Sequence, residues 1–569
     1  MKTTYLHKHV VLFFISLVIL LQSCGKREDW SDLSFDLLKN EQEETFENLQ
    51  PYALPGMSDQ PVVLTLLDSK SKSSKAYSEA IQKSCDYTKL PFRATDIDGW
   101  NAQPSIPATV RVVMIHNTKR VESAGIPVLL DFVLRGGTVY VPFAVEDHRF
   151  AFLLGFQSRA NWETDTTSKG WHYTTPVFPG MTGKKIGKEI PLYGFTPDNF
   201  SPSIKVLATA ANNPNYPTII ENPIGKGRVL FYNTSFDFTK IDRGFLFVGI
   251  LKGIEGVPYA VANTSTLFLD DFPAPQYDIK AEPVLTEMNK TTAEFVSDVW
   301  WPDMRKLAKE FDIPYAAMLT FDYRNKIVPP FTLDQWNLLK TNKRDKVESL
   351  SDWLVDDVKN NGHEMAFHGY NHVSLTKKLW TNPKFIPMVM NTVKKKWEIN
   401  NYGSLPATYV PPSNIIDATG LKLLKESMPS LQFMCSLYLG EKPVGGDREF
   451  DFDPYEKQFF DYPRISSGFY FSEDEEYTIQ SLYLITGIWN HFVHPDDIYQ
   501  IPATADKTSG GYSLRNQKTY GWRKSANSDK AMFPEFRKFI INFKKQYPLL
   551  RFTDGRTGGK LVWAWRPRK

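Results

Sequence analysis

The C-terminal half of the chain alternates continuous apolar runs with amphipathic segments, and this alternation restricts the fold more than any other feature. Runs such as "TLFLDDFP" and "EMAFHGYNH" lack an alternation of apolar and polar residues, which is typical of strands buried on both faces. Segments with helical spacing separate them. The pattern predicts parallel strands with helices outside, so that chemistry gathers at the carboxyl ends of the strands.

The length of 569 residues is too great for one hydrophobic core, so we expect more than one domain. Residues 59–260 predict a doubly wound α/β domain, with strands at "PVVLTLLDS", "VRVVMIH", "TVYVPF" and "GKGRVLFYN". Residues 262–569 predict a distorted (β/α) barrel. Residues 25–58 are polar and interrupted by proline, and we interpret them as a tether.

The first 24 residues have the pattern of an export signal. Lys2 and Lys8 precede an apolar run from Val10 to Leu21, which makes about 18 Å of helix and is too short to cross a bilayer. The run ends in "LQSC", which resembles the lipobox of bacterial lipoproteins and implies a lipid on Cys24. The alternative is an ordinary signal peptide with an unrelated cysteine. A lipid anchor implies the cell envelope, with the outer membrane favoured and the protein facing the periplasm or the surface.

Charge and cysteine content narrow the function further. The formal net charge is +3, without the basic excess that nucleic-acid binding needs, so we expect no nucleic-acid partner. Cys85 and Cys435 are the cysteines other than Cys24, and we expect both to be small buried residues without a disulfide.

Histidines and aspartates follow several of the predicted strands. His368 and His372 lie four residues apart, a spacing that lets two imidazoles reach one Zn²⁺ from a helical turn or a strand-to-helix corner. Asp270 and Asp271 directly follow a buried strand, where adjacent carboxylates need a positive partner. By itself the histidine pair is weak evidence for a metal site. The chemistry depends on whether the histidine pair and the aspartate pair lie close together in the folded chain.

Together these motifs resemble the NodB-homology polysaccharide deacetylases of carbohydrate esterase family 4. "FLDDFP" matches the first motif of that family and "GHEMAFHGYNH" the second. The resemblance implies that Asp270 is the catalytic base and that Asp271, His368 and His372 bind the metal. It also implies the release of acyl groups from a polysaccharide. Zinc is the first choice for these ligands, and cobalt, nickel or iron would also fit.

A late motif of the same family places a histidine as general acid at the end of a strand. "IWNHFVHPDD" offers His491 and His494, and we favour His494 because Pro495 ends the strand there. The third motif departs from the family, since "TYVPPSN" has Tyr409 and no arginine ahead of its prolines. Arg464 is the candidate that would orient the base instead. The fourth motif, an aspartate–tryptophan cluster, is not found.

The N-terminal domain resembles the class I glutamine-amidotransferase-like fold through "LRGGTVYVPF" and "GKGRVLFYN". Active members carry a cysteine between glycines on a sharp elbow. Cys85 has no such flanks, so we expect no amidotransferase nucleophile in this flavodoxin/amidotransferase-like domain.

Aromatic residues near strand ends are candidates for stacking on sugar rings, and we select Tyr370, Trp489 and Trp301. Two other functions stay open. A non-catalytic glycan-binding or polysaccharide-assembly lipoprotein would explain the missing third-motif arginine. Glycosidic cleavage would need two carboxylates about 5–9.5 Å apart, which Asp270 and Asp271 alone do not offer.

Overall fold

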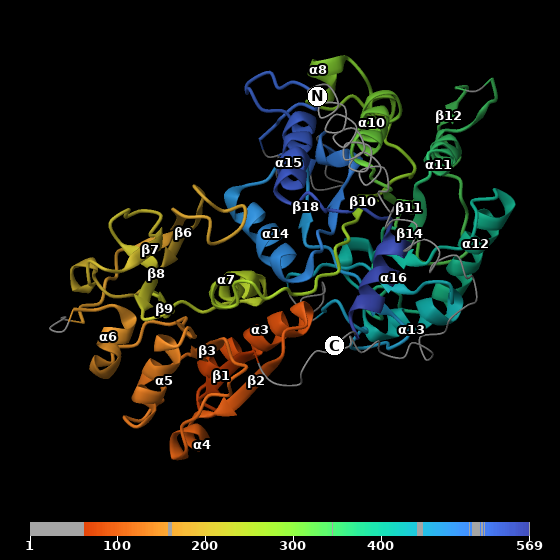
Figure 1. Cartoon of the computed structure of the whole chain (residues 1–569). Coiled ribbons are helices and arrows are strands. Elements are labelled where there is room, and N and C mark those ends of the chain that lie inside the picture. The colour runs from red at the N-terminus through yellow and green to blue at the C-terminus, as the bar shows by residue number, and fades with distance from the viewer. Residues whose placement is uncertain are drawn as a thin grey trace, which may run out of the picture. The chain divides into compact units, whose positions relative to one another are not determined.

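The computed structural model describes residues 62–157, 162–343, 345–440, 448–499, 501–502, 512–513, 516 and 518–567. Within these residues the chain forms two large sheets and two small two-stranded sheets (Figure 1). The predicted signal segment, the tether and Cys24 lie outside the described residues. The domain division predicted near residue 260 falls between the two large sheets and stays a prediction.

The first sheet has the strand order β2-β1-β3-β4-β9-β8-β7-β5-β6. Its strands are β1 (Val63–Leu67), β2 (Phe92–Asp96), β3 (Val112–Ile115), β4 (Thr138–Val141), β5 (Lys169–Tyr173), β6 (Lys185–Pro191), β7 (Lys205–Thr209), β8 (Pro217–Ile224) and β9 (Gly227–Tyr232). Its helices are α3 (Lys72–Thr88), α4 (Ile97–Ala102), α5 (Gly125–Leu134), α6 (Ala151–Leu154) and α7 (Arg243–Gly253).

This sheet is parallel in one half only. The four predicted strands, β1, β3, β4 and β9, pair in parallel, and β2 joins them at the edge. Strands β5 to β8 add an antiparallel half that the sequence reading missed. The pairing changes from parallel to antiparallel between β9 and β8. These strands are joined by the two residues Gly225 and Lys226, and so short a hairpin can join only antiparallel strands. The expectation of a parallel sheet is therefore wrong for β5 to β8.

Helices cover both faces of the parallel half. Leu64 and Leu66 belong to one buried cluster with residues of α4, α5 and α6. The opposite face carries Tyr140, which lies so close to Gly249 of α7 that an added Cβ would approach the ring to 2.4 Å. Alternate residues of a strand thus reach two cores, which explains why the strands read as continuous apolar runs.

The second sheet has the order β17-β16-β15-β14-β11-β10-β19-β18. Its strands are β10 (Leu267–Asp270), β11 (Ala316–Asp322), β14 (Glu364–Asn371), β15 (Thr408–Tyr409), β16 (Phe433–Met434), β17 (Phe460–Asp461), β18 (Ser466–Ser467) and β19 (His491–Val493). The small sheets pair β12 (Lys340–Thr341) with β13 (Glu348–Ser349), and β20 (Ile501–Pro502) with β21 (Tyr512–Ser513). The helices are α8 (Val284–Met288), α9 (Thr292–Phe295), α10 (Trp301–Phe311), α11 (Leu350–Asn360), α12 (Phe385–Ile399), α13 (Ala418–Ser427), α14 (Glu473–Thr486), α15 (Met532–Gln546) and α16 (Gly555–Trp565).

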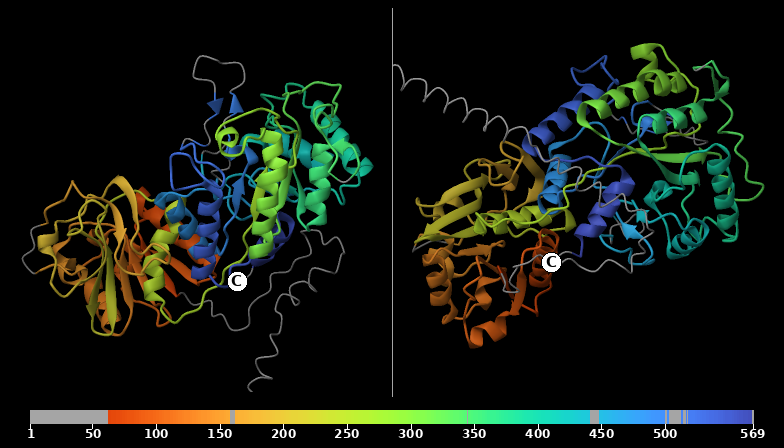
Figure 2. Two further views of the ribbon diagram at one scale, coloured as in Figure 1. Left: turned by 90° about the horizontal axis from the view of Figure 1, so that it is seen from above. Right: turned by 45° about the vertical axis from the view of Figure 1, so that its right-hand side comes forward.

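All pairings in the second sheet are parallel. The sheet is curled into a half-barrel consistent with a (β/α) barrel, and Figure 2 shows the green and teal helices α10 to α13 along its outer side. β10 and β11 are buried over their whole length, as their apolar runs predict.

One predicted strand begins later than expected. The apolar residues just before "IWNHFVHPDD" end α14 at Thr486, and Gly487 then takes the left-handed φ of +66°. Glycine adopts this conformation without a steric penalty, so it ends the helix. β19 starts only at His491, which still leaves His494 beyond the strand's end.

The two cysteines behave as expected. Cys85 and Cys435 are unpaired and fully buried, and burial raises the pKa of each thiol above its ordinary value. Cys85 lies within α3 and not on a strand-to-helix elbow. Both residues therefore act as small apolar groups of the core.

A carboxyl group at the start of β14 makes stability depend on pH. Burial and the charge of Asp554 raise the pKa of Glu364 to about 7, whereas a glutamate in the unfolded chain has a pKa of about 4.3. Between these values the folded state keeps a proton that the unfolded state releases, so stability falls as pH rises through this window.

We predict that Glu364→Gln removes this part of the pH dependence, measured as thermal midpoints of both proteins from pH 4 to pH 8. A constant difference between the two midpoints across this range would contradict the assignment.

Candidate functional site

Several polar side chains meet where neighbouring strands of the second sheet end. β10 pairs with β11 on one side and with β19 on the other, and β14 lies next to β11. Parallel strands bring their carboxyl ends to one edge. The residues that follow β10, β14 and β19 therefore come together although they are far apart in the chain.

The three predicted metal ligands form one group at this edge. Asp271, His368 and His372 each offer a ligand atom, and these atoms all lie within 4.8 Å of one another. Nε2 of His368 is 3.7 Å from Oδ1 of Asp271, and the two imidazole centroids are 5.1 Å apart. One carboxylate and two imidazoles are the donor set that divalent zinc prefers in open catalytic sites.

Two local departures from regular backbone aim these ligands. Asp271 takes a left-handed φ of +54° directly after β10, a conformation that aspartate tolerates better than most residues. In β14 the register with β11 steps from Leu319↔Phe367 to Thr320↔Gly369, so His368 is the extra residue of a β-bulge. Bulges re-aim a side chain, and Gly369 supplies the φ of +144° that the bulge needs.

The surroundings of His368 prepare it as a neutral ligand. Its Nδ1 lies 2.8 Å from the carbonyl oxygen of Val410, so an N–H on Nδ1 leaves the lone pair on Nε2, the atom near Asp271. Burial lowers the pKa of His368 to about 4, so the ring is uncharged near neutral pH. Thr320 also donates its hydroxyl to Oδ1 of Asp271 at 3.3 Å.

Asp270, the predicted base, is almost fully buried beside the ligand group, with 2% of its surface exposed. Burial by itself raises the pKa of this carboxyl, but the charge of Arg464 and of the nearby imidazoles outweighs it and lowers the pKa. Oδ2 is ion-paired with Nη1 of Arg464. Oδ1 is buried and has no hydrogen-bond partner within the described part of the chain, so it is an ionised acceptor that lacks a donor.

Arg464, the predicted substitute for the missing third-motif arginine, lies beside Asp270. Its side chain is fully buried and holds Asp270 through one nitrogen and Oδ1 of Asn414 through the other. The guanidinium also lies over the ring of Phe492, 3.9 Å from its centroid. The arginine therefore reaches the base from the segment between β17 and β18 and not from the end of β15.

The two candidate acids lie in different surroundings. Nε2 of His494 is 3.8 Å from Oδ2 of Asp270, and its Nδ1 is 3.2 Å from Oδ1 of Asp497. His491 is fully buried, with its ring nitrogens 2.9 Å from the hydroxyl of Ser466 and 2.8 Å from the carbonyl oxygen of Gly468. Burial lowers the pKa of His491 to about 3. His494 is therefore the candidate acid, because it lies near Asp270, whereas His491 is a buried residue that stabilises the core through its hydrogen bonds.

The predicted sugar-binding aromatics lie in the core, and we correct that prediction. Trp301 and Trp489 are fully buried and donate their indole N–H groups to Asp357 and Ser466. Tyr370 is 1% exposed and donates its hydroxyl to the carbonyl oxygen of Thr332. None of the three offers a free ring face to a sugar.

Two other aromatic residues lie at the site, and one of them, Tyr277, was not predicted. Tyr323 follows β11, and its ring centroid is 6.4 Å from that of His372. Burial, followed by the charge of Asp271, raises the pKa of Tyr323. Tyr277 stacks on Tyr323 at 6.0 Å and is 37% exposed. The sequence signal that could have found Tyr277 is its position in the loop that follows β10.

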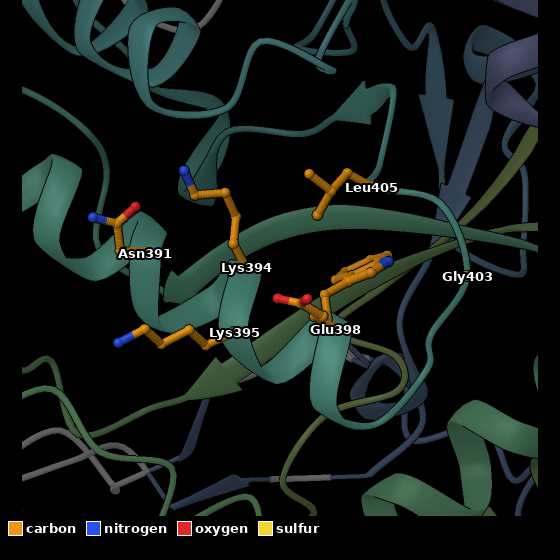
Figure 3. A pocket seen from close by; sticks show the side chains of 7 residues that line it. Asn391, Lys394, Lys395, Glu398, Gly403 and Leu405 are labelled. Carbon is orange, nitrogen blue, oxygen red and sulfur yellow. The ribbon is translucent and has the colours of Figure 1, made fainter.

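A cavity of about 510 Å³ lies elsewhere, beside α12, and contains none of the candidate residues. Figure 3 shows its lining, which includes Lys394, Lys395, Glu398 and Leu405. Because none of its titratable side chains, Lys394, Lys395 and Glu398, is buried, we base no function on this cavity. No helix of the described residues is both long and apolar enough to cross a membrane.

Comparisons with known proteins add a family but no activity. No curated protein matches the chain. Among solved structures, the chain is similar to a Mycobacterium smegmatis protein described as "putative polysaccharide deacetylase", with 14% identity over 41% of this chain and 76% of that chain and a TM-score of 0.26. It is also similar to a β-galactosidase from Bacillus circulans sp. alkalophilus, with 14% identity over 35% of this chain and a TM-score of 0.26.

The match covers 31% of the length of that β-galactosidase, so nothing about the whole enzyme passes to this chain. Similarity at these TM-scores carries no argument about function. A family model, in contrast, matches residues 62–562. The chain therefore belongs to the family described as "Uncharacterised protein conserved in bacteria (DUF2194)".

Proposed function

We propose that the chain is a metal-dependent hydrolase that removes acyl groups, such as acetyl, from a polysaccharide. The observation that carries the proposal is the meeting of the ligand group Asp271, His368 and His372 with the arginine-held carboxylate of Asp270. Buried ionisable groups with shifted pKa values concentrate at functional sites. Oδ1 of Asp270 has no hydrogen-bond donor among the described residues, so it is open to a donor such as water.

The donor set supports a divalent metal. Two neutral imidazoles and a carboxylate suit zinc first, and cobalt, nickel or iron next. When bound, such an ion polarises an acyl carbonyl and makes water more acidic. Asp271, His368 and His372 would hold it, with Val410 and Thr320 fixing the orientation of two of the ligands.

The chain's own residues supply the proton transfers of the hydrolysis. Asp270, kept ionised by Arg464, accepts a proton from the attacking water through its unpaired Oδ1. The water oxygen bonds to the acyl carbon, and the bond from that carbon to the sugar nitrogen or oxygen breaks. His494, oriented by Asp497, donates a proton to the leaving atom. The products are a carboxylate and a free amine or hydroxyl on the sugar.

A non-catalytic glycan-binding or assembly lipoprotein is the second candidate, and the missing third-motif arginine is the observation that favours it. Arg464 weakens this case because a guanidinium is paired with Asp270 by another route.

The remaining parts of the chain fit an exported enzyme. We propose a lipid anchor at Cys24 that holds the protein at the cell envelope, with the outer membrane favoured. The order β2-β1-β3-β4-β9 supports a flavodoxin-like N-terminal core, and the buried Cys85 supports a domain without an amidotransferase nucleophile.

We predict that the wild-type protein binds one divalent ion and that His368→Ala and His372→Ala each abolish stoichiometric binding, because two ligands remain in each variant. Elemental analysis after dialysis against Zn²⁺ measures this. The control is His148→Ala, which removes an exposed histidine just before α6, far along the chain from the candidate ligands. Stoichiometric zinc in both site variants, or none in the wild type, would contradict the metal site.

We predict that Asp270→Asn keeps the metal and lowers acetate release by about 10²–10⁴-fold, since the amide cannot take the proton from water. Acetate released from acetylated polysaccharides is measured with Zn²⁺, Co²⁺ or Ni²⁺ added. Asp356→Asn is the matched control, because it changes one member of another aspartate pair, on α11. Unchanged turnover in Asp270→Asn would show that another group is the base.

A further inference from the structure

The guanidinium of Arg464 is held at two points, and only one of them is the base. Nη1 pairs with Oδ2 of Asp270, and Nη2 donates to Oδ1 of Asn414. A planar guanidinium bound to one acceptor can still rotate about that contact, whereas a second acceptor fixes its plane. Asn414 is thus the residue that decides how Arg464 faces Asp270.

The backbone at Asn414 is unfavourable for most residues. Ser413 and Asn414 are consecutive and take φ values of +54° and +60° after β15. Non-glycine residues rarely adopt this region, and such strain is maintained where the surroundings require a given side chain there. Glycine would relieve the strain but would leave Nη2 of Arg464, deep in the protein, without its acceptor.

Asn414 also lies where the third motif departs from the deacetylase pattern. It follows the prolines of "VPPSN", the segment that has no arginine. The same segment carries Val410, whose carbonyl oxygen lies against Nδ1 of His368. One short segment after β15 therefore contacts a candidate ligand and, through Arg464, the candidate base.

We infer that Asn414 is a positioning residue, which fixes Arg464 so that the carboxylate of Asp270 stays aimed at the reacting water. This inference rests on the proposed function. Asn414 reaches the reaction only through Arg464, so its loss should affect turnover while leaving metal binding intact. Its effect should also vanish once Arg464 is absent.

The test compares Asn414→Ala, Asn414→Gly and Asn414→Asp in the full chain, with kcat, KM and zinc content measured for each. We expect Ala and Gly to lower kcat by about 10- to 100-fold, the loss of one hydrogen bond to a charged group, with KM and zinc unchanged. Aspartate tolerates the left-handed backbone and keeps the acceptor oxygen, so Asn414→Asp should recover most of kcat. Ser413→Ala is the matched control, because Ser413 shares the strained backbone and its side chain is exposed.

A double-mutant cycle with Arg464→Ala separates positioning from general damage. We expect Asn414→Ala to add no further loss in that background, because both changes remove the same contact. Additive losses, or full kcat in Asn414→Gly, would overturn the inference. A wild type that binds zinc and releases acetate while Asn414→Ala behaves identically overturns this inference alone. A wild type without zinc or acetate release overturns the proposed function and the inference with it.

Discussion

The buried ion pair between Arg464 and Asp270 is the interaction on which the candidate site depends. A charge removed from water is costly unless a partner of opposite sign and enough hydrogen bonds replace its solvent. Here each ion meets part of that need in the other, and their positions in the sequence are 194 residues apart. The pair therefore connects β10 with the segment that joins the two edge strands, β17 and β18, and it forms only where the sheet brings these segments together.

The rest of the site follows from the parallel sheet. Because β10, β14 and β19 end at the same edge, an aspartate pair, a histidine pair and a later histidine meet there without any long excursion of the backbone. The departures from regular geometry at this edge are specific: Asp271 and Asn414 take positive φ, and His368 occupies a bulge. Each aims a polar side chain toward the others, as backbone strain at functional sites commonly does.

Much of the site could be predicted because its residues follow apolar runs. A run buried on both faces indicates a parallel strand, so the aspartate pair Asp270 and Asp271 at the end of such a run was expected at the sheet edge. The roles of these residues and of His368 came from the resemblance to the deacetylase motifs. Aromatic residues gave no such signal. Trp489 lies next to β19 in the sequence, but its ring is covered by Phe539 and Phe543 of α15, and only the packing of a helix some fifty residues later decides that.

The sequence pattern by itself determined the strand–helix alternation, the parallel half of the first sheet and the position of the candidate ligands near strand ends. The reason is that a strand buried on both faces is apolar at successive positions, which can be recognised in the sequence. Tertiary structure decided what depends on distant partners. It made β5 to β8 antiparallel through a short hairpin, placed Arg464 and Asn414 beside the base, and left His494 near Asp270 while burying His491. The physical reason is that hydrophobic periodicity is a property of each segment, whereas the pairing of buried charges and the covering of aromatic rings depend on segments that meet only in the folded chain.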